Sequence, residues 1–272
     1  DPVSLATGPV AISTGATAGN ISFGQTLYGG QTLGLTSGTG NISFAGIVGA
    51  TPLGAVTINL ANNVTTSAAF SAASVNQATS GTGTTQIGGL LTTTAAAGVT
   101  LDAATVDLNA GITSNGAPVV LNASTLVDLA SGQTITTTAA ANSGLISGLI
   151  DINVSGTGTV NLVGDLVTTG ATHATLTGSA GGAVTIDTAN NTIAVANITT
   201  SGGAAAAALQ TGGAAGTIGI NTGTDNVITL NASTLTAAGG TGATQGAGAT
   251  ISFGDPVSLA TGPVAISTGA TA

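Results

Sequence analysis

Short stretches of the chain alternate apolar and polar residues, and Gly, Asn, Ser or Thr separates one stretch from the next. Val56-Thr57-Ile58-Asn59-Leu60 is one example, and the same alternation recurs at 99–102, 150–154, 184–187, 218–220 and 228–231. A period of two places successive side chains on opposite sides of a β-strand. The pattern therefore predicts many short strands, each with an apolar side toward a core and a polar side toward solvent.

Helix-forming patterns are nearly absent from the chain. It has no Glu or Lys, and Gly or β-branched residues interrupt almost every window that a helix would need. The Ala-rich stretch from Ala204 to Leu209 is the main exception, but Gly pairs flank it on both sides, so we expect a loop there. The fold class that follows is all-β.

A longer period joins these strands into a series. Ile21-Ser22-Phe23 returns as Ile42-Ser43-Phe44, 42 − 21 = 21 residues later, and 101–106 resembles 121–126, 121 − 101 = 20 residues later. A period of ~20–23 residues suits one coil of a parallel β-helix with three short strands and three turns. We expect apolar residues inside the coils and Thr, Asn, Ser and Asp outside. The spacing is irregular at 66–89, where we expect a loop that bulges out.

The longest period is shown by an identical sequence at two places. Residues 1–18, DPVSLATGPVAISTGATA, are the same as residues 255–272, an offset of 255 − 1 = 254 residues. We therefore expect residues 1–254 to form one full tandem repeat and 255–272 to begin the next identical repeat. At ~21 residues a coil, one repeat would hold roughly twelve coils stacked ~4.8 Å apart. At the junction Gly254-Asp255-Pro256 we expect a turn, because Pro fixes φ and suits the start of a coil.

The composition excludes several classes of partner. The chain has no Lys or Arg, nine acidic residues and a net charge of −9, so nucleic acid is not an expected partner, because neutralising phosphates requires cations. Hydrophobic residues make up 42% of the chain. Even so, no apolar run approaches the roughly 18–20 residues of a membrane span, and we expect no membrane insertion of this segment. The absence of Cys excludes a disulfide framework.

Three strand-turn units carry a family resemblance: VTLDAATVDLNAG (99–111), PVVLNASTLVDLASG (118–132) and GLIDINVSGTGTVNLVGDL (148–166). They resemble units of the filamentous-haemagglutinin-type large exoproteins, which are secreted by two-partner systems and share their style with autotransporter passengers. The resemblance covers most of the chain. It implies a right-handed parallel β-helix, export to the bacterial cell surface and a role in adhesion or fibre formation. This chain differs from typical members in lacking Lys and Arg and in its identical long repeat, which favours a periodic polymer.

Few residues suggest chemistry. His173 is the only histidine, and with no Cys or Glu to join it in a zinc site or catalytic dyad we expect an outward-pointing, inert side chain. Two sets of aspartates would bind Ca²⁺ through oxygen ligands if they stacked into ladders on one face. The alternative is separate, solvated carboxylates, which the absence of the Gly-Gly-x-Gly-x-Asp motif favours. The two sets are Asp107, Asp128 and Asp151, and Asp165 with Asp187.

Carbohydrate chemistry finds little support either. Glycosidases need paired carboxylates in a cleft, with neighbouring aromatics for the sugar, and the chain has only Tyr28 and four Phe. We therefore expect no enzyme, no catalytic, cofactor-binding or metal-binding residues, and no cofactor. The abundance of Asn, Ser and Thr explains most of the glycosylation sequons, so they do not by themselves imply glycosylation. The sequons lie at Asn20, Asn41, Asn63, Asn122, Asn153, Asn190, Asn197 and Asn231.

These features together favour a structural protein: an extracellular filament at the bacterial surface, made of β-helical repeats joined end to end. Its expected partners are adjacent repeats along the filament, with lateral bundling as a further contact. The filament would serve surface attachment, cell-cell cohesion or a biofilm or sheath scaffold. An adhesin that binds a glycan or another cell through its side face is the alternative. Ice binding is a third hypothesis, for which Thr134 to Thr138 and Thr199-Thr200 are suggestive although a regular Thr-x-Thr spacing in each coil is missing.

Overall fold

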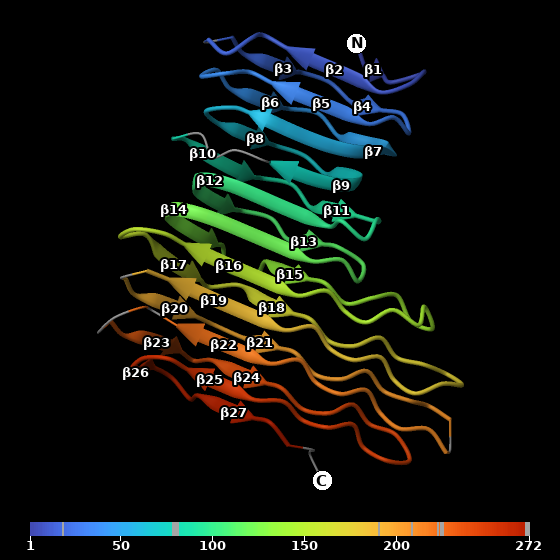
Figure 1. Cartoon of the computed structure of the whole chain (residues 1–272), viewed down its shortest axis with the longest axis vertical. Coiled ribbons are helices and arrows are strands. Elements are labelled where there is room, and N and C mark those ends of the chain that lie inside the picture. The colour runs from blue at the N-terminus through green and yellow to red at the C-terminus, as the bar shows by residue number, and fades with distance from the viewer. Residues whose placement is uncertain are drawn as a thin grey trace.

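The computed structural model describes residues 1–17, 19–77, 82–189, 191–207, 209–221, 223 and 226–269. Short parallel strands stack along one long axis into a β-solenoid, with the N-terminus at one end and the C-terminus at the other (Figure 1). The described residues contain no helix, so the expected all-β fold is confirmed. None of these residues forms a helix long and apolar enough to cross a membrane.

The strands lie on three faces, which we number in chain order. Face 1 contains β1 (Val3–Ser4), β4 (Leu27–Tyr28), the starts of β7 (Val48–Leu60) and β9 (Phe70–Gln77), β11 (Leu91–Thr93), β13 (Ile112–Thr113), β15 (Thr134–Thr136), β18 (Asp165–Val167), β21 (Ile198–Thr199), β24 (Thr234–Thr236) and β27 (Ala265–Ser267). Face 2 contains β2 (Val10–Ser13), β5 (Leu33–Thr36), the ends of β7 and β9, the starts of β12 (Val99–Leu108) and β14 (Val119–Leu129), β16 (Ile150–Val154), β19 (Val184–Thr188), β22 (Ile218–Asn221) and β25 (Ile251–Phe253). Face 3 contains β3 (Ile21–Phe23), β6 (Ile42–Phe44), β8 (Val64–Thr66), β10 (Thr84–Ile87), the ends of β12 and β14, β17 (Thr159–Leu162), β20 (Ile193–Val195), β23 (Ile228–Asn231) and β26 (Val257–Thr261).

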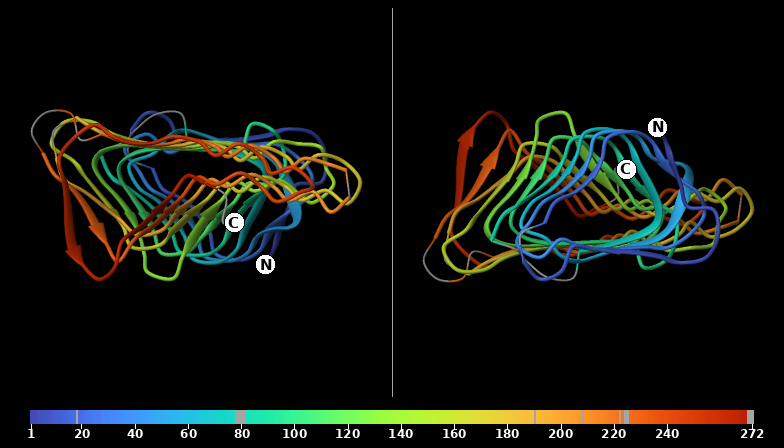
Figure 2. Two further views of the ribbon diagram at one scale, coloured as in Figure 1. Left: turned by 90° about the horizontal axis from the view of Figure 1, so that it is seen from below. Right: turned by 90° about the horizontal axis from the view of Figure 1, so that it is seen from above.

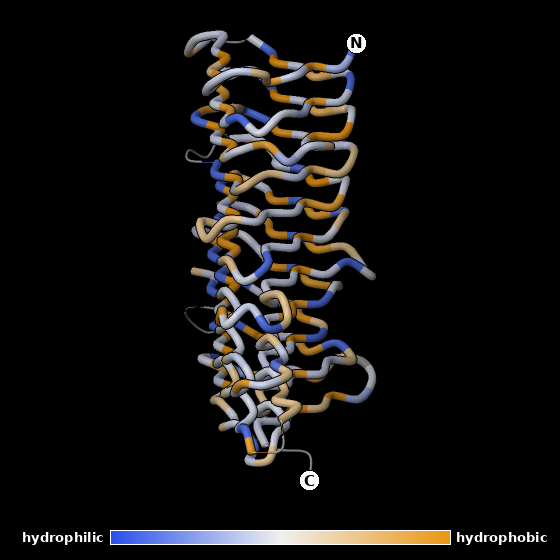
Figure 3. The backbone as a smooth tube through the Cα atoms, turned by 90° about the vertical axis from the view of Figure 1, so that its right-hand side faces the viewer, coloured by the Kyte–Doolittle hydropathy of each residue, from blue (hydrophilic) through white to orange (hydrophobic). Residues whose placement is uncertain are grey.

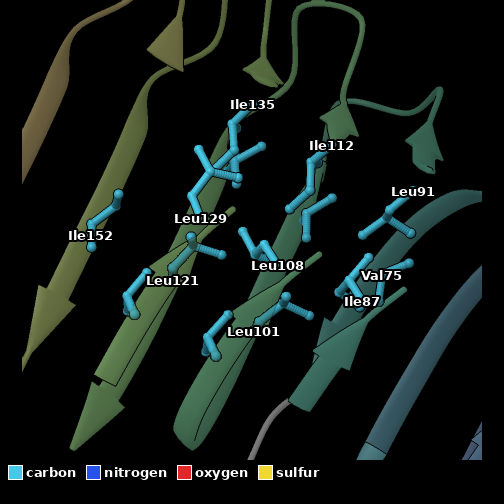
Figure 4. Packing of buried hydrophobic residues seen from close by; sticks show 14 of the residues in the cluster. Val75, Ile87, Leu91, Leu101, Leu108, Ile112, Leu121, Leu129, Ile135 and Ile152 are labelled. Atoms are coloured by element: carbon cyan, nitrogen blue, oxygen red, sulfur yellow. The ribbon is translucent and has the colours of Figure 1, made fainter. Parts of the chain in front are cut away.

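Alternation along each strand builds the core. In β14, Leu121, Val127 and Leu129 are fully buried, while the alternate residues Asn122 and Asp128 reach the surface in part. Leu101 and Leu108 lie at matching positions one coil away, and these side chains meet in the interior (Figure 4). Apolar positions recur between polar ones on successive coils (Figure 3). Full burial of one such aliphatic side chain is worth about 1.5–3 kcal/mol, so stability accumulates coil by coil.

The length of a coil changes along the chain. Up to β15, residues in register on successive coils are 19 to 24 positions apart, as in Val56↔Val75 (75 − 56 = 19) and Val3↔Leu27 (27 − 3 = 24). Later coils are longer, and Ile198↔Leu235 spans 235 − 198 = 37 positions. The expected length of ~20–23 residues therefore fits only the first part of the chain, and fewer coils fit into 254 residues than the twelve expected.

The added length of the later coils lies between face 1 and face 2. There the chain leaves the solenoid and returns at 137–148, 168–182, 200–216 and 237–249, forming what we call the glycine-rich extension. Its successive layers project from one side of the coil (Figure 2). The Ala-rich stretch at 204–209 falls inside this extension, and its described residues form no helix, as expected.

One local expectation is wrong. The segment 66–89 does not form a single bulging loop, because residues 70–77 and 84–87 are strands β9 and β10 in register with their neighbours. Their alternation is hard to recognise because polar Gln77 and Thr85 take inward positions that apolar residues occupy on neighbouring coils. Residues 78–81 lie outside the described part of the chain.

Candidate functional site

The aspartates do not form the ladders that a Ca²⁺ site would need. Asp107 and Asp128 are in register on face 3, but Asp151 lies on face 2. Asp165 and Asp187 also lie on different faces, face 1 and face 2. The ladder hypothesis is therefore wrong for both sets, because the longer coils place the later aspartates on other faces. Within the described residues, no group of three or more His, Cys, Asp or Glu side chains is arranged to hold a metal ion.

Among the described residues, Asp107 and Asp128 are the one pair of carboxylates in register, and side-chain amides bond to both. Gln86 Nε2 donates to Asp107 Oδ2 over 2.8 Å, and Asn161 Nδ2 donates to Asp128 Oδ1 over 2.6 Å. Asn109 Nδ2 donates to both Asp107 oxygens, at 3.1 and 3.0 Å. Side-chain amides on face 3 thus satisfy part of the carboxylate oxygens and link neighbouring coils.

His173 is buried, which corrects the expectation that it points outward. Only 4% of the residue is exposed, and its Nε2 lies 3.0 Å from Ser179 Oγ. His173 is on the outgoing arm of the glycine-rich extension and Ser179 is on the returning arm of the same layer. Ser179 is also buried, at 8% exposed, so its hydroxyl lacks the access that a nucleophile needs. The pair holds the two arms together.

Three threonines close the base of the extension. The buried Thr137, Thr168 and Thr200 each donate a hydroxyl hydrogen bond to a carbonyl oxygen on the returning arm of their own layer, namely those of Gly148, Gly182 and Gly216. Farther out, backbone bonds cross between the arms: Gly203 N donates to Ser179 O at 2.9 Å and Gly213 N to Gly203 O at 2.8 Å. At Gly203 and Gly213 the neighbouring backbone lies so close that a Cβ atom would clash with it, so these positions favour glycine.

Asparagines form a ladder where the chain enters face 3. The Asn20 Oδ1 accepts from Asn41 N at 2.9 Å, the Asn41 Oδ1 from Asn63 N at 3.2 Å, and the Asn63 Oδ1 from Thr84 N at 2.7 Å. Each side chain therefore ties its coil to the next one. Three of the glycosylation sequons belong to this ladder, while Asn190 lies outside the described residues.

The asparagine ladder borders a shallow polar groove on face 3. Amide and hydroxyl groups of this kind form hydrogen bonds with sugars, but aromatic side chains, which bind the apolar side of a sugar ring, do not line this groove. The groove is lined by Asn20, Ser22, Asn41, Ile42, Ser43, Asn63, Thr65, Thr84 and Gln86.

Face 1 carries a threonine row that sequence spacing hides. The outward residues Thr92, Thr113 and Thr136 are in register on three successive coils, and Val167 follows on the next. Thr199 and Thr236 continue the row. The steps between these positions grow from 113 − 92 = 21 to 236 − 199 = 37 residues, so no fixed period reveals the row.

The C-terminal end of the solenoid presents core residues to solvent. Leu259 is 66% exposed and Ile266 is 51% exposed, although each points toward the interior of its coil. Their partners in register one coil earlier, Leu230 and Leu235, are fully buried. At the opposite end, Val3 is 41% exposed. Each end is thus a cross-section of the apolar core, bordered by unpaired strand edges of the kind that associate with further strands.

The turn expected at Gly254-Asp255-Pro256 is confirmed, since these residues form the bend between β25 and β26. The described part of the chain thus combines side faces of amides and hydroxyls with two apolar ends. Comparisons with protein-family models, curated proteins and solved structures found no match to this chain.

Proposed function

We propose that this chain is a unit of an extracellular filament at the bacterial surface, in which 254-residue repeats continue one another end to end. Its work is mechanical: it spans distance and holds cells or surfaces together in an attachment, biofilm or sheath layer. The filament carries no catalytic site. The resemblance to filamentous-haemagglutinin-type exoproteins motivates the location and the right-handed sense of the coil, which is also the usual sense of parallel β crossovers.

The observation that carries this proposal is the state of the last coil. Leu259 and Ile266 repeat the inward positions of Leu230 and Leu235 but are largely exposed. One further coil stacked on this end would bury Leu259 and Ile266 in the way that Leu230 and Leu235 are buried. Residues 255–272 are themselves the start of a second copy of the sequence. The partner that fits this end is therefore more of the same solenoid.

The side faces support a mechanical role. Parallel backbone ladders run through all three faces, and the asparagine ladder adds side-chain bonds between coils on face 3. Such a rod distributes tension over many equivalent hydrogen bonds, so no single residue acts as a site.

Concentration-dependent association of the 272-residue chain tests this proposal. We expect end-to-end assemblies of constant width in electron micrographs and a sedimentation coefficient that rises with concentration. Replacing Leu259→Asp together with Ile266→Asp should abolish this growth, because charges would have to be buried at the joint. The matched control replaces two outward threonines, Thr100→Asp with Thr113→Asp, and should grow as before. A chain that stays monomeric at every concentration, or two variants that associate equally, would contradict end-to-end assembly.

The threonine row on face 1 favours ice binding as a second candidate function. A flat row of hydroxyl and methyl groups at the spacing of neighbouring strands, ~4.8 Å, is a regular surface that ordered water can match. The row includes Thr92, Thr113, Thr136, Thr199 and Thr236. Thermal hysteresis of the purified chain, lost in Thr113→Asp but kept in Thr100→Asp on face 2, would support this function. An unchanged freezing point would reject it.

A further inference from the structure

The two copies of the eighteen-residue sequence occupy different faces of the solenoid. In the first copy, Val3 lies on face 1, in register with Leu27. In the second copy, the equivalent Val257 lies on face 3, in register with Ile228. The next strand differs in the same way: Ile12 lies on face 2, opposite Leu35, whereas the equivalent Ile266 lies on face 1, opposite Leu235.

The same side chains point inward in both copies. Val3 and Val257 occupy inward positions on their strands, as do Ile12 and Ile266. Because each face pairs parallel strands and alternates apolar-inward with polar-outward residues, a segment that fits one face fits the others. The repeated sequence therefore keeps the same side chains pointing inward when it changes face.

The shift follows from the number of strands in one repeat. Nine successive pairings on face 1 lead from β1 to β24. β25 on face 2 and β26 on face 3 then bring the chain to Val257. One 254-residue repeat thus winds through nine coils and two further faces, not through a whole number of coils.

The following segment of the sequence fits the open edge of face 2. Ile21-Ser22-Phe23 and Ile42-Ser43-Phe44 are in register on face 3, where Phe23 and Phe44 stack with ring centroids 5.2 Å apart. Ile251-Ser252-Phe253 is a third copy, on face 2. In a continuing array, the Ile-Ser-Phe that begins at residue 21 recurs one 254-residue repeat later. That copy begins 21 + 254 − 251 = 24 residues after Ile251. That interval equals the step between Val3 and Leu27, so this strand would fall directly above Ile251.

We propose that successive repeats of the array are rotated by one face, so that equivalent surfaces return to the same side only after three repeats. This rests on the proposed end-to-end filament and specifies its joint: the occupant of the open C-terminal end is the next copy of residues 19–44. The threonine row and the glycine-rich extension then change sides from one repeat to the next. A filament built in this way presents each surface on all three sides and contacts neighbours in every lateral direction.

Disulfide trapping in a chain of two complete repeats tests the rotation. The chain contains no Cys, so introduced pairs report without background. The rotated joint places Ser258 beside Thr229 on face 3. A joint without rotation would return Val257 to face 1 and place Ser258 beside Thr236. Outward residues in register on neighbouring parallel strands lie within the Cα separation that a disulfide allows.

We expect Thr229→Cys with Ser258→Cys to give roughly tenfold more intramolecular disulfide than Thr236→Cys with Ser258→Cys. Thr199→Cys with Thr236→Cys, which are in register whatever the joint, is the positive control. A disulfide that forms mainly between the cysteines at positions 236 and 258 would overturn the rotation. So would the absence of a disulfide in both test pairs while the control pair forms one. The length of the same two-repeat chain, measured in solution, reports separately whether the repeats continue end to end, so a wrong rotation and a wrong filament give different results.

Discussion

The Thr85 hydroxyl donates a hydrogen bond of 2.8 Å to Gln77 Oε1 inside the solenoid, where both residues are 1% exposed. Gln77 lies in register with Ile58, and Thr85 with Val64 and Val106, so the pair interrupts otherwise apolar rows. The amide nitrogen of Gln77 has no hydrogen-bond partner among the described residues. A buried polar atom of this kind lowers stability.

Replacing the whole pair should therefore help the fold, whereas replacing half of it should harm it. Thr85→Val alone leaves the entire buried Gln77 amide without a partner, and we expect a loss of about 1–3 kcal/mol in the free energy of unfolding. The double variant Gln77→Leu with Thr85→Val matches the neighbouring apolar residues and should be neutral or more stable than the parent. Chemical denaturation measures both. A double variant less stable than the parent would show that the pair contributes more than its burial costs.

The close packing of successive layers in the glycine-rich extension predicts a specific sensitivity. A Cβ atom on Gly203 would clash with the backbone carbonyl of Ala171 in the preceding layer. We expect Gly203→Ala to break the cross-arm bond from Gly213 N to Gly203 O and to speed amide hydrogen exchange throughout 168–216. The strands of the first coils should keep their protection, because each coil contacts only its neighbours.

Gly24→Ala is the matched control for that change. A Cβ atom on Gly24 meets nothing within 4 Å, and the residue has no positive φ. The substitution should leave exchange unchanged and, by restricting the unfolded chain, add about 0.4–1 kcal/mol of stability. Equal exchange in the two variants would mean that the arms are not packed as described.

The stacked carboxylates on face 3 predict a salt-dependent effect. Asp107 and Asp128 are in register on adjacent strands, where like charges repel. In Asp128→Asn the new amide is able to accept from Asn161 and donate to Asp107, which completes the chain of side-chain bonds that begins at Gln86. We expect a gain of about 0.2–1 kcal/mol at low ionic strength.

This gain should shrink as salt is added, because screening already weakens the repulsion in the parent. Asp102→Asn is the control, since Asp102 lies in register with uncharged Asn122. A gain of the same size in both variants, or one that does not change with salt, would assign the effect to something other than the carboxylate pair.

The strands were predictable from the sequence where alternation was strict. Segments such as Val56 to Leu60 and Ile150 to Val154 lie in strands as expected, because period two with an apolar side leaves few other solutions. Gln77 and Thr85 broke that pattern, and β9 and β10 were missed for this reason. The family resemblance and the location at the cell surface stay predictions.

The glycine-rich extension was not predictable in the same way. Many of its contacts are backbone bonds between small residues, which leave no apolar period in the sequence. The burial of His173 depends on Ser179 returning beside it, and nothing in the local sequence indicates that meeting. The changing coil length also concealed the threonine row on face 1, and it separated Asp151 from Asp107 and Asp128.

The measurement that tests the account most directly is the length of chains with one, two and three repeats, by small-angle X-ray scattering. One repeat winds through nine coils and two of the three faces of the next coil, and successive coils are ~4.8 Å apart. Each added repeat should therefore lengthen the rod by ~46 Å at constant cross-section. That result would show that successive repeats form one continuous solenoid. A cross-section that thickens while the length stays constant would show that repeats fold side by side, and it would contradict the filament proposed for this chain.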